Sequence, residues 1–104
     1  MDDPTFVDTN VFLRFFVRDF EPFYQKAKEL FEKAEKGIAK LETSDMVIAE
    51  IVWVLESYYD FSKTEIAEII DTILETKNIT VANHSRIREA INLYVSGPMD
   101  FIDA

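Results

Sequence analysis

Near its amino end the sequence reads Thr5-Phe6-Val7-Asp8-Thr9-Asn10, an apolar run that stops at three polar residues. The apolar run follows Pro4 and is typical of a short buried strand. Aspartate, threonine and asparagine favour turns and helix caps over strand interiors, because their side chains form hydrogen bonds with nearby backbone groups. We therefore expect a strand over residues 5–7, a turn directly after it, and a short apolar helix over residues 11–17.

The rest of the chain repeats this alternation of strands and helices. Further helices are expected over residues 22–36, 45–59, 62–74 and 86–94, and further strands over residues 38–42 and 78–82. Short apolar strands that alternate with helices indicate a parallel sheet covered on both faces, so the sequence predicts an α/β fold. Ligands bind beyond the carboxyl ends of the strands in such sheets, and Asp8 and Asn10 follow the first strand at that edge.

The composition bounds the size and the class of the protein. The chain has 104 residues and a mass of 12.1 kDa, with 48% hydrophobic and 13% aromatic residues. This size suits one compact domain with a real core, and the composition excludes a disordered tail or a collagen-like repeat. The sequence contains no cysteine, which excludes disulfide frameworks and thiolate metal sites and fits a reducing compartment.

The charge of the chain narrows the classes of partner. Twenty acidic residues against eleven basic ones give a net charge of -9. A surface so negative repels phosphate backbones unless a bound divalent cation or a basic strip reverses the field locally, which excludes general coating of nucleic acid. Asp2 and Asp3 stand where a signal peptide needs basic residues, and no apolar run approaches the roughly 18 residues of a membrane span. We therefore expect a cytoplasmic protein that does not contact a membrane.

Three acidic residues stand out by their positions. Asp8 follows a buried strand, Glu50 interrupts the most apolar helix, and Asp103 follows the helix-breaking pair Gly97-Pro98. A buried carboxylate is costly unless it is paired or bound to a metal, and the helix offers Glu50 no basic residue within one turn. A shared Mg²⁺ or Mn²⁺ ion would satisfy all three acids, because hard cations prefer oxygen ligands. Such an ion would polarise a phosphate oxygen and lower the pKa of a bound water, which could then attack phosphorus.

Each candidate residue also has a structural interpretation that the sequence leaves open. Asp8 could be a turn or N-cap residue, and Asn10 could be a turn residue. Glu50 could face solvent through a narrow gap in its helix. Asp100 and Asp103 have the spacing of a capping box, in which Asp100 would be the N-cap.

These motifs resemble those of the PIN domain family. The segment Phe6-Val7-Asp8-Thr9-Asn10-Val11-Phe12-Leu13-Arg14 is similar to the family's opening strand and helix. Ala49-Glu50-Ile51-Val52-Trp53-Val54-Leu55 resembles its second acidic motif, and Met99-Asp100-Phe101-Ile102-Asp103-Ala104 resembles its third. The order and spacing match over essentially the whole chain, and the resemblance extends to the toxin subunits of VapBC-type toxin–antitoxin systems. It implies a PIN-like three-layer α/β/α fold with a short central parallel sheet.

The resemblance implies a metal-dependent endoribonuclease that is the toxin component of a toxin–antitoxin pair. By their positions in the motifs, Asp8, Glu50 and Asp103 would be both the catalytic residues and the ligands of Mg²⁺ or Mn²⁺. Asn10 matches a polar position that supports the site by hydrogen bonding. Asp100 falls one helical turn from Asp103 and would also support the site.

The resemblance implies partners as well. They are an RNA substrate, a cognate antitoxin whose tail reaches into the acidic pocket, and a second copy of the chain, because relatives of the toxin type usually form homodimers. The net charge of -9 would then attract a basic segment of the antitoxin. Four arginines are candidates for phosphate contacts: Arg14, which lies in the first motif, Arg18, Arg86 and Arg88.

One departure from the family concerns the carboxyl end. PIN domains continue beyond the third motif with a helix, a further strand and usually another acidic residue, whereas the sequence ends at Ala104. We therefore expect residues 1–104 to be a single PIN-like domain that is incomplete at its carboxyl end. The alternative function is a catalytically inactive PIN-like binding module whose acidic pocket docks a basic partner peptide. An enzyme should gain thermal stability with Mn²⁺ and lose RNA cleavage on Asp8→Asn, whereas a docking module need show neither.

Overall fold

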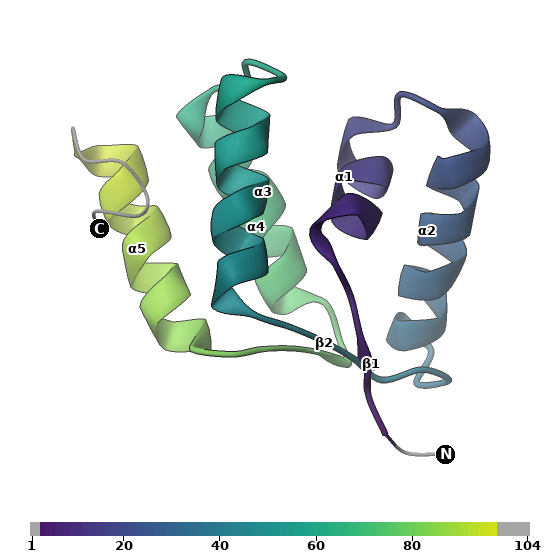
Figure 1. Cartoon of the computed structure of the whole chain (residues 1–104). Coiled ribbons are helices and arrows are strands. Elements are labelled where there is room, and N and C mark those ends of the chain that lie inside the picture. The colour runs from purple at the N-terminus through teal and green to yellow at the C-terminus, as the bar shows by residue number, and fades with distance from the viewer. Residues whose placement is uncertain (1–2, 98–104) are drawn as a thin grey trace.

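A computed structural model describes residues 3–97 of the chain, with three strands and five helices in that range (Figure 1). The elements follow one another as β1 (Thr5–Phe6), α1 (Thr9–Val17), α2 (Glu21–Glu35), β2 (Leu41–Thr43), α3 (Asp45–Ser57), α4 (Lys63–Glu75), β3 (Ile79–Val81) and α5 (His84–Ser96). Asp100 and Asp103 lie outside the described residues. None of the helices in residues 3–97 combines the length and the apolar character that a membrane span needs.

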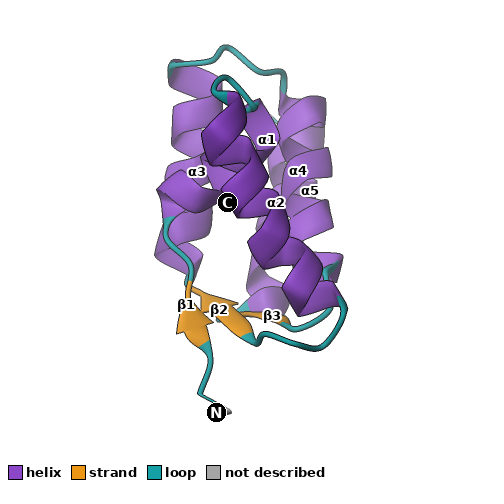
Figure 2. Cartoon of the chain, turned by 90° about the vertical axis from the view of Figure 1, so that its right-hand side faces the viewer, coloured by secondary structure: helices purple, strands orange, loops and turns teal. Residues whose placement is uncertain are grey.

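The three strands form one parallel sheet in the order β1-β2-β3. Thr5 lies opposite Leu41, and Leu41 lies opposite Ile79. In Figures 1 and 2 the strands lie side by side at one end of the molecule and the helices stand together above them. The predicted α/β class and parallel pairing are confirmed. All three strands therefore run in the same direction, toward the loops that lead into α1, α3 and α5.

The second strand is displaced from its predicted position. The alternating pattern predicts a strand over residues 38–42, but β2 begins at Leu41. Residues 37–39 instead close α2: Gly37 has a φ of 79°, and the backbone N–H groups of Ile38 and Ala39 donate to the Lys33 carbonyl. Ile38 is consequently 71% exposed, so its place in the alternation does not mark a buried strand position.

The helix starts agree with the capping signals in the sequence. Ser44 Oγ accepts a hydrogen bond from the Val47 backbone N–H at 3.1 Å and caps α3. At α4 the expected capping box is complete, because Ser62 Oγ accepts from the Glu65 N–H while the Glu65 carboxylate accepts from the Ser62 N–H. The Ser62 N–H lowers the pKa of Glu65. These caps fix where α3 and α4 begin.

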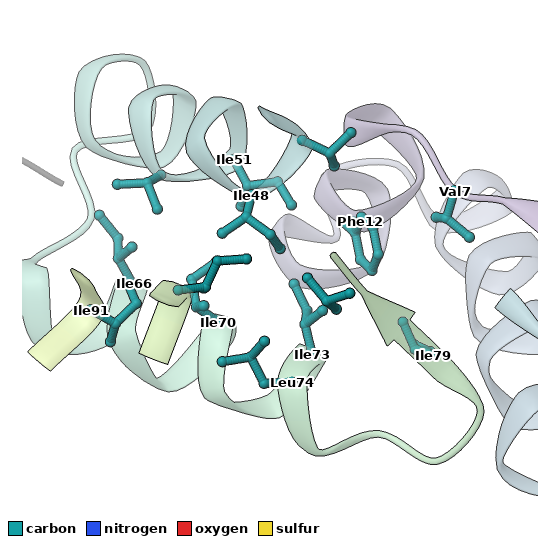
Figure 3. Close-up of a cluster of buried hydrophobic side chains, with 14 of the residues drawn as sticks. Val7, Phe12, Ile48, Ile51, Ile66, Ile70, Ile73, Leu74, Ile79 and Ile91 are labelled. Atoms are coloured by element: carbon teal, nitrogen blue, oxygen red, sulfur yellow. The ribbon is translucent and has the colours of Figure 1, made fainter. Parts of the chain in front are cut away.

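One hydrophobic core joins the helices to the sheet (Figure 3). Its fully buried side chains come from the sheet as well as the helices, and include Leu41 of β2 and Phe12, Ile51 and Ile91 of the helices, all at 0–1% exposure. The ring of Phe12 stacks on that of Phe31, with centroids 5.4 Å apart, which holds α1 against α2. Helix α1 also packs against α3. This packing places the first turn of α1 beside the middle of α3.

Candidate functional site

Asp8 lies between the first strand and the first helix. The Val7 backbone N–H still donates to the Glu42 carbonyl beside β1, and Asp8 follows as the N-cap of α1. Its Oδ1 accepts a hydrogen bond from the Thr9 backbone N–H at 2.7 Å. The N-cap interpretation of this residue is therefore correct. The cap uses only one carboxylate oxygen, because Oδ2 accepts no hydrogen bond from residues 3–97.

Glu50 lies on the side of α3 that faces the start of α1. Its Oε1 accepts a hydrogen bond from Thr9 Oγ1 at 2.5 Å, across 41 positions of the sequence. Within residues 3–97, Glu50 has no ion-pair partner and its Oε2 accepts no hydrogen bond. The structure thus brings the first and second acidic motifs together.

The expectation that Glu50 is a buried carboxylate in a central helix is wrong, and the alternative interpretation, that Glu50 faces solvent, is correct. Glu50 is exposed, and so are Met46 at 79% and Trp53 at 61% on the same helix. The reason is the packing of α3, which lies mainly against α1 and α4. Those two helices cover the stripe that contains Ile48, Ile51 and Leu55, and the stripe of Met46, Glu50 and Trp53 remains open.

Thr9 is a residue of the candidate site that the sequence reasoning missed. It is 4% exposed, and it contacts both acids, donating its backbone N–H to Asp8 and its hydroxyl to Glu50. A buried hydroxyl needs a hydrogen-bond partner. A threonine at the start of an apolar helix was therefore the one signal that pointed to a polar group on a distant element.

The free oxygens of Asp8 and Glu50 suit a hard cation. Thr9 occupies one oxygen of each carboxylate, and the second oxygen of each remains available. Mg²⁺ is commonly held by one or two carboxylates together with waters and substrate phosphates. In residues 3–97 no three acidic or histidine side chains form a group that could hold a metal ion. A third ligand at Asp103, and a supporting role for Asp100, stay predictions.

Asn10 and Arg14 border a small cavity between α1 and α2. The cavity has a volume of about 400 Å³, and Phe23 and Tyr59 also line it. The Arg14 guanidinium lies 4.5 Å from the centroid of the Phe23 ring. Asn10 is exposed and makes no side-chain hydrogen bond within the described residues, so its supporting role stays a prediction.

Tyr59 lies in the wall of this cavity. Its hydroxyl donates to Asp19 Oδ2 at 3.3 Å. Burial raises the pKa of Tyr59, and the Asp19 carboxylate raises it further. The tyrosine therefore stays protonated at neutral pH and acts as a hydrogen-bond donor in the wall of the cavity.

A larger cavity of about 750 Å³ lies between α3 and α5 and includes Glu50 in its wall. At one end Asn83 Nδ2 donates to Asp45 Oδ2 at 2.8 Å and ties the start of α5 to the start of α3. Trp53 and Arg86 line the same cavity. Of the four arginines proposed as phosphate contacts, Arg86 shares a cavity with a candidate acid.

The two remaining arginines are engaged elsewhere. Arg18 forms an ion pair with Glu21 at 3.1 Å, and Arg88 lies 3.4 Å from Asp71. Both pairs are half exposed, so they contribute little to stability. They nevertheless leave Arg14 and Arg86 as the arginines next to the candidate site.

Comparisons with known proteins agree with this arrangement. A model of the PIN domain family matches residues 5–104. A VapC ribonuclease from Aquifex aeolicus (strain VF5) is 33% identical over 97 residues, which cover 93% of this chain and 71% of that relative. No solved structure matches.

Proposed function

The chain belongs to the PIN domain family, and from this premise we propose that it is a ribonuclease that hydrolyses RNA phosphodiester bonds with Mg²⁺ or Mn²⁺. The family match also confirms the PIN-like α/β/α architecture expected from the sequence. The VapC ribonuclease supports RNA as the substrate class. The observation that carries the proposal is the contact of Thr9 with both acids, since it holds two carboxylates from distant motifs at one place.

Asp8 and Glu50 are the described residues that would hold the cation, and Asp103 is the proposed third ligand. Bound there, the cation would polarise a phosphate oxygen and lower the pKa of a water molecule. Thr9 holds one oxygen of each carboxylate in place by a hydrogen bond and leaves the other oxygen available to a cation. Asn10 and Asp100 are proposed to support these ligands.

The acidic chain needs local positive charge to hold RNA. Its net charge is -9, so the cation must do part of this work and nearby arginines the rest. Arg14 is proposed to contact a substrate phosphate, because it lies one helical turn from Asn10 and borders the same cavity.

We propose two protein partners on the same basis. One is a cognate antitoxin, which the name of the VapC relative supports, and a basic segment of it would be attracted to the acidic pocket. The other is a second copy of the chain in a homodimer. Both partners are expected to change the access of RNA to Asp8 and Glu50.

Metal dependence is the direct test of the proposed function. We expect cleavage of mixed RNA with Mn²⁺ or Mg²⁺ and none with excess chelator. At a tenfold excess over its Kd, Mn²⁺ should stabilise the fold by about 1.4 kcal/mol and raise the thermal midpoint by about 5–10 °C. Cleavage that persists in chelator would refute the metal-assisted mechanism, and a protein that binds a basic peptide without cutting RNA would be a docking module.

Thr9→Val should lower activity by removing the hydroxyl that positions Glu50. Valine matches the shape of threonine but leaves Glu50 Oε1 without its donor, so we expect a loss of about 10–100-fold in kcat/KM and in Mn²⁺ affinity. Thr9→Ser retains the hydroxyl and should recover most of both. A Mn²⁺ titration in which the thermal midpoint is recorded at each concentration separates this positioning role from a folding defect. Wild-type Mn²⁺ affinity in Thr9→Val would contradict the positioning role.

A further inference from the structure

The cavity between α3 and α5 continues the candidate site along the surface. Glu50 lies in its wall, so a ligand in the cavity would lie next to the proposed metal site. From α3 the side chains of Met46 and Trp53 line it, and from α5 those of Arg86 and Ala90 do. Its volume of about 750 Å³ is in the range of cavities that bind small ligands.

Arg86 is the basic residue that lines this cavity, which we call the α3–α5 groove. Arg18 and Arg88 form ion pairs, and Arg14 lies over an aromatic ring, whereas Arg86 makes no ion pair, hydrogen bond or ring contact within residues 3–97. In a chain of net charge -9, an arginine without a carboxylate partner is available to an anion. A phosphate group of RNA is such an anion, and the metal ion proposed at Asp8 and Glu50 would bind a phosphate next to this groove.

Trp53 supplies an apolar wall to the same groove. It is 61% exposed although tryptophan is a large and mostly buried residue type. Its ring offers a flat face on which any nucleobase can stack. A stacking ring combined with an arginine is the usual arrangement by which proteins hold single-stranded nucleic acid.

We propose that the α3–α5 groove binds one unpaired RNA nucleotide beside the bond that is cut, with Trp53 stacked on the base and Arg86 paired with a phosphate. This inference rests on the proposed ribonuclease function and names where its substrate lies. RNA fits the groove better than a second copy of the chain, because a second copy would bury Asp45, Glu50 and Arg86 at a desolvation cost. A basic peptide could pair with Glu50 but would leave the Arg86 guanidinium without an anion, whereas an RNA phosphate supplies that anion.

Trp53 reports on its own surroundings, since it is the only tryptophan in the chain. The full chain with Asp8→Asn, which should not cut RNA, is titrated with a single-stranded RNA decamer while tryptophan emission is recorded. We expect saturable quenching. Arg86→Ala should weaken the affinity about tenfold, whereas Lys26→Ala, which removes an exposed positive charge on α2 outside the groove, should leave it unchanged.

The role of the ring itself is tested by substitution. With fluorescently labelled RNA and anisotropy as the readout, Trp53→Ala should weaken binding about tenfold and Trp53→Phe should retain most of it. Tyr58→Ala is the matched control, because Tyr58 directly follows α3 and is 79% exposed but does not line the groove.

Three outcomes would overturn the inference. The first is the absence of quenching by RNA. The second is an emission change that depends on protein concentration when no RNA is present, as a second copy in the groove would cause. The third is quenching by polylysine in place of RNA. Cleavage by the wild-type chain is measured in parallel. Metal-dependent cleavage without quenching refutes the groove assignment alone, and quenching without any cleavage refutes the ribonuclease proposal.

Discussion

Asp8→Asn and Glu50→Gln should each reduce metal-dependent RNA cleavage by about 10³-fold or more. Both changes remove a negative charge from a proposed metal ligand and keep the size of the side chain. A metal that stabilises transition-state charge lowers the activation free energy by several kcal/mol, and each 1.36 kcal/mol corresponds to a factor of ten in rate. The measurement is initial cleavage rate at saturating Mn²⁺, together with the rise of the thermal midpoint on adding Mn²⁺, which should vanish in both variants.

The design of these variants separates chemistry from folding. Asparagine caps helices about as well as aspartate, so Asp8→Asn should keep the start of α1 intact. Glutamine can still accept the Thr9 hydroxyl, so Glu50→Gln should keep the contact between α1 and α3. Glu68→Gln on exposed α4 surface is the matched control and should cut RNA at the wild-type rate. Wild-type activity in either site variant would remove these carboxylates from the mechanism.

Local chemistry made much of the fold predictable. Ser62 and Glu65, three positions apart, predict a capping box, and the structure contains that box. Ser44 likewise caps the helix that follows it. Short apolar strands between amphipathic helices were enough to predict a parallel sheet. Signals of this kind depend on neighbours within one turn or one strand, so a single sequence carries them.

Contacts between distant elements were harder to predict. The apolar pattern of α3 does not say which side chains find a partner, and Trp53 and Met46 remain exposed although they are as hydrophobic as the buried positions. Phe23 is 42% exposed for a related reason, because Arg14 covers its ring instead of the core. Only the packing of α1 against α3 determines that Thr9 reaches Glu50.

The candidate site also combines features that local motifs predict with features that depend on contacts between distant elements. The positions of Asp8 and Glu50 in their motifs pointed to a shared site, and the structure places both beside Thr9. The role of Thr9 depends on a contact across 41 positions that no local pattern encodes. Arg86 was one of four equivalent arginines in the sequence, and it is distinguished by its place in the groove with Glu50.

Phe12→Ala should destabilise the protein more than any surface change. Phe12 is 0% exposed and stacks on Phe31, which in turn meets Phe15 edge to face with centroids 5.2 Å apart. Removing a buried phenylalanine ring costs about 3–5 kcal/mol, while a domain of this size has roughly 5–15 kcal/mol in total. Urea denaturation should therefore show a midpoint shifted to low denaturant, or a chain already partly unfolded in buffer.

Phe12 is also three positions beyond Thr9 on α1, so its packing supports the site as well as the core. Phe12→Leu keeps most of the buried volume and should lose clearly less stability. Ile38→Ala, at a side chain that is 71% exposed, should stay within about 0.5 kcal/mol of the wild type. If α1 is held mainly by Phe12, RNA cleavage by Phe12→Ala should fall in proportion to the folded fraction as urea is added. A variant that remains fully folded and loses less than about 1 kcal/mol would show that Val7 and Phe31 hold α1 without this ring.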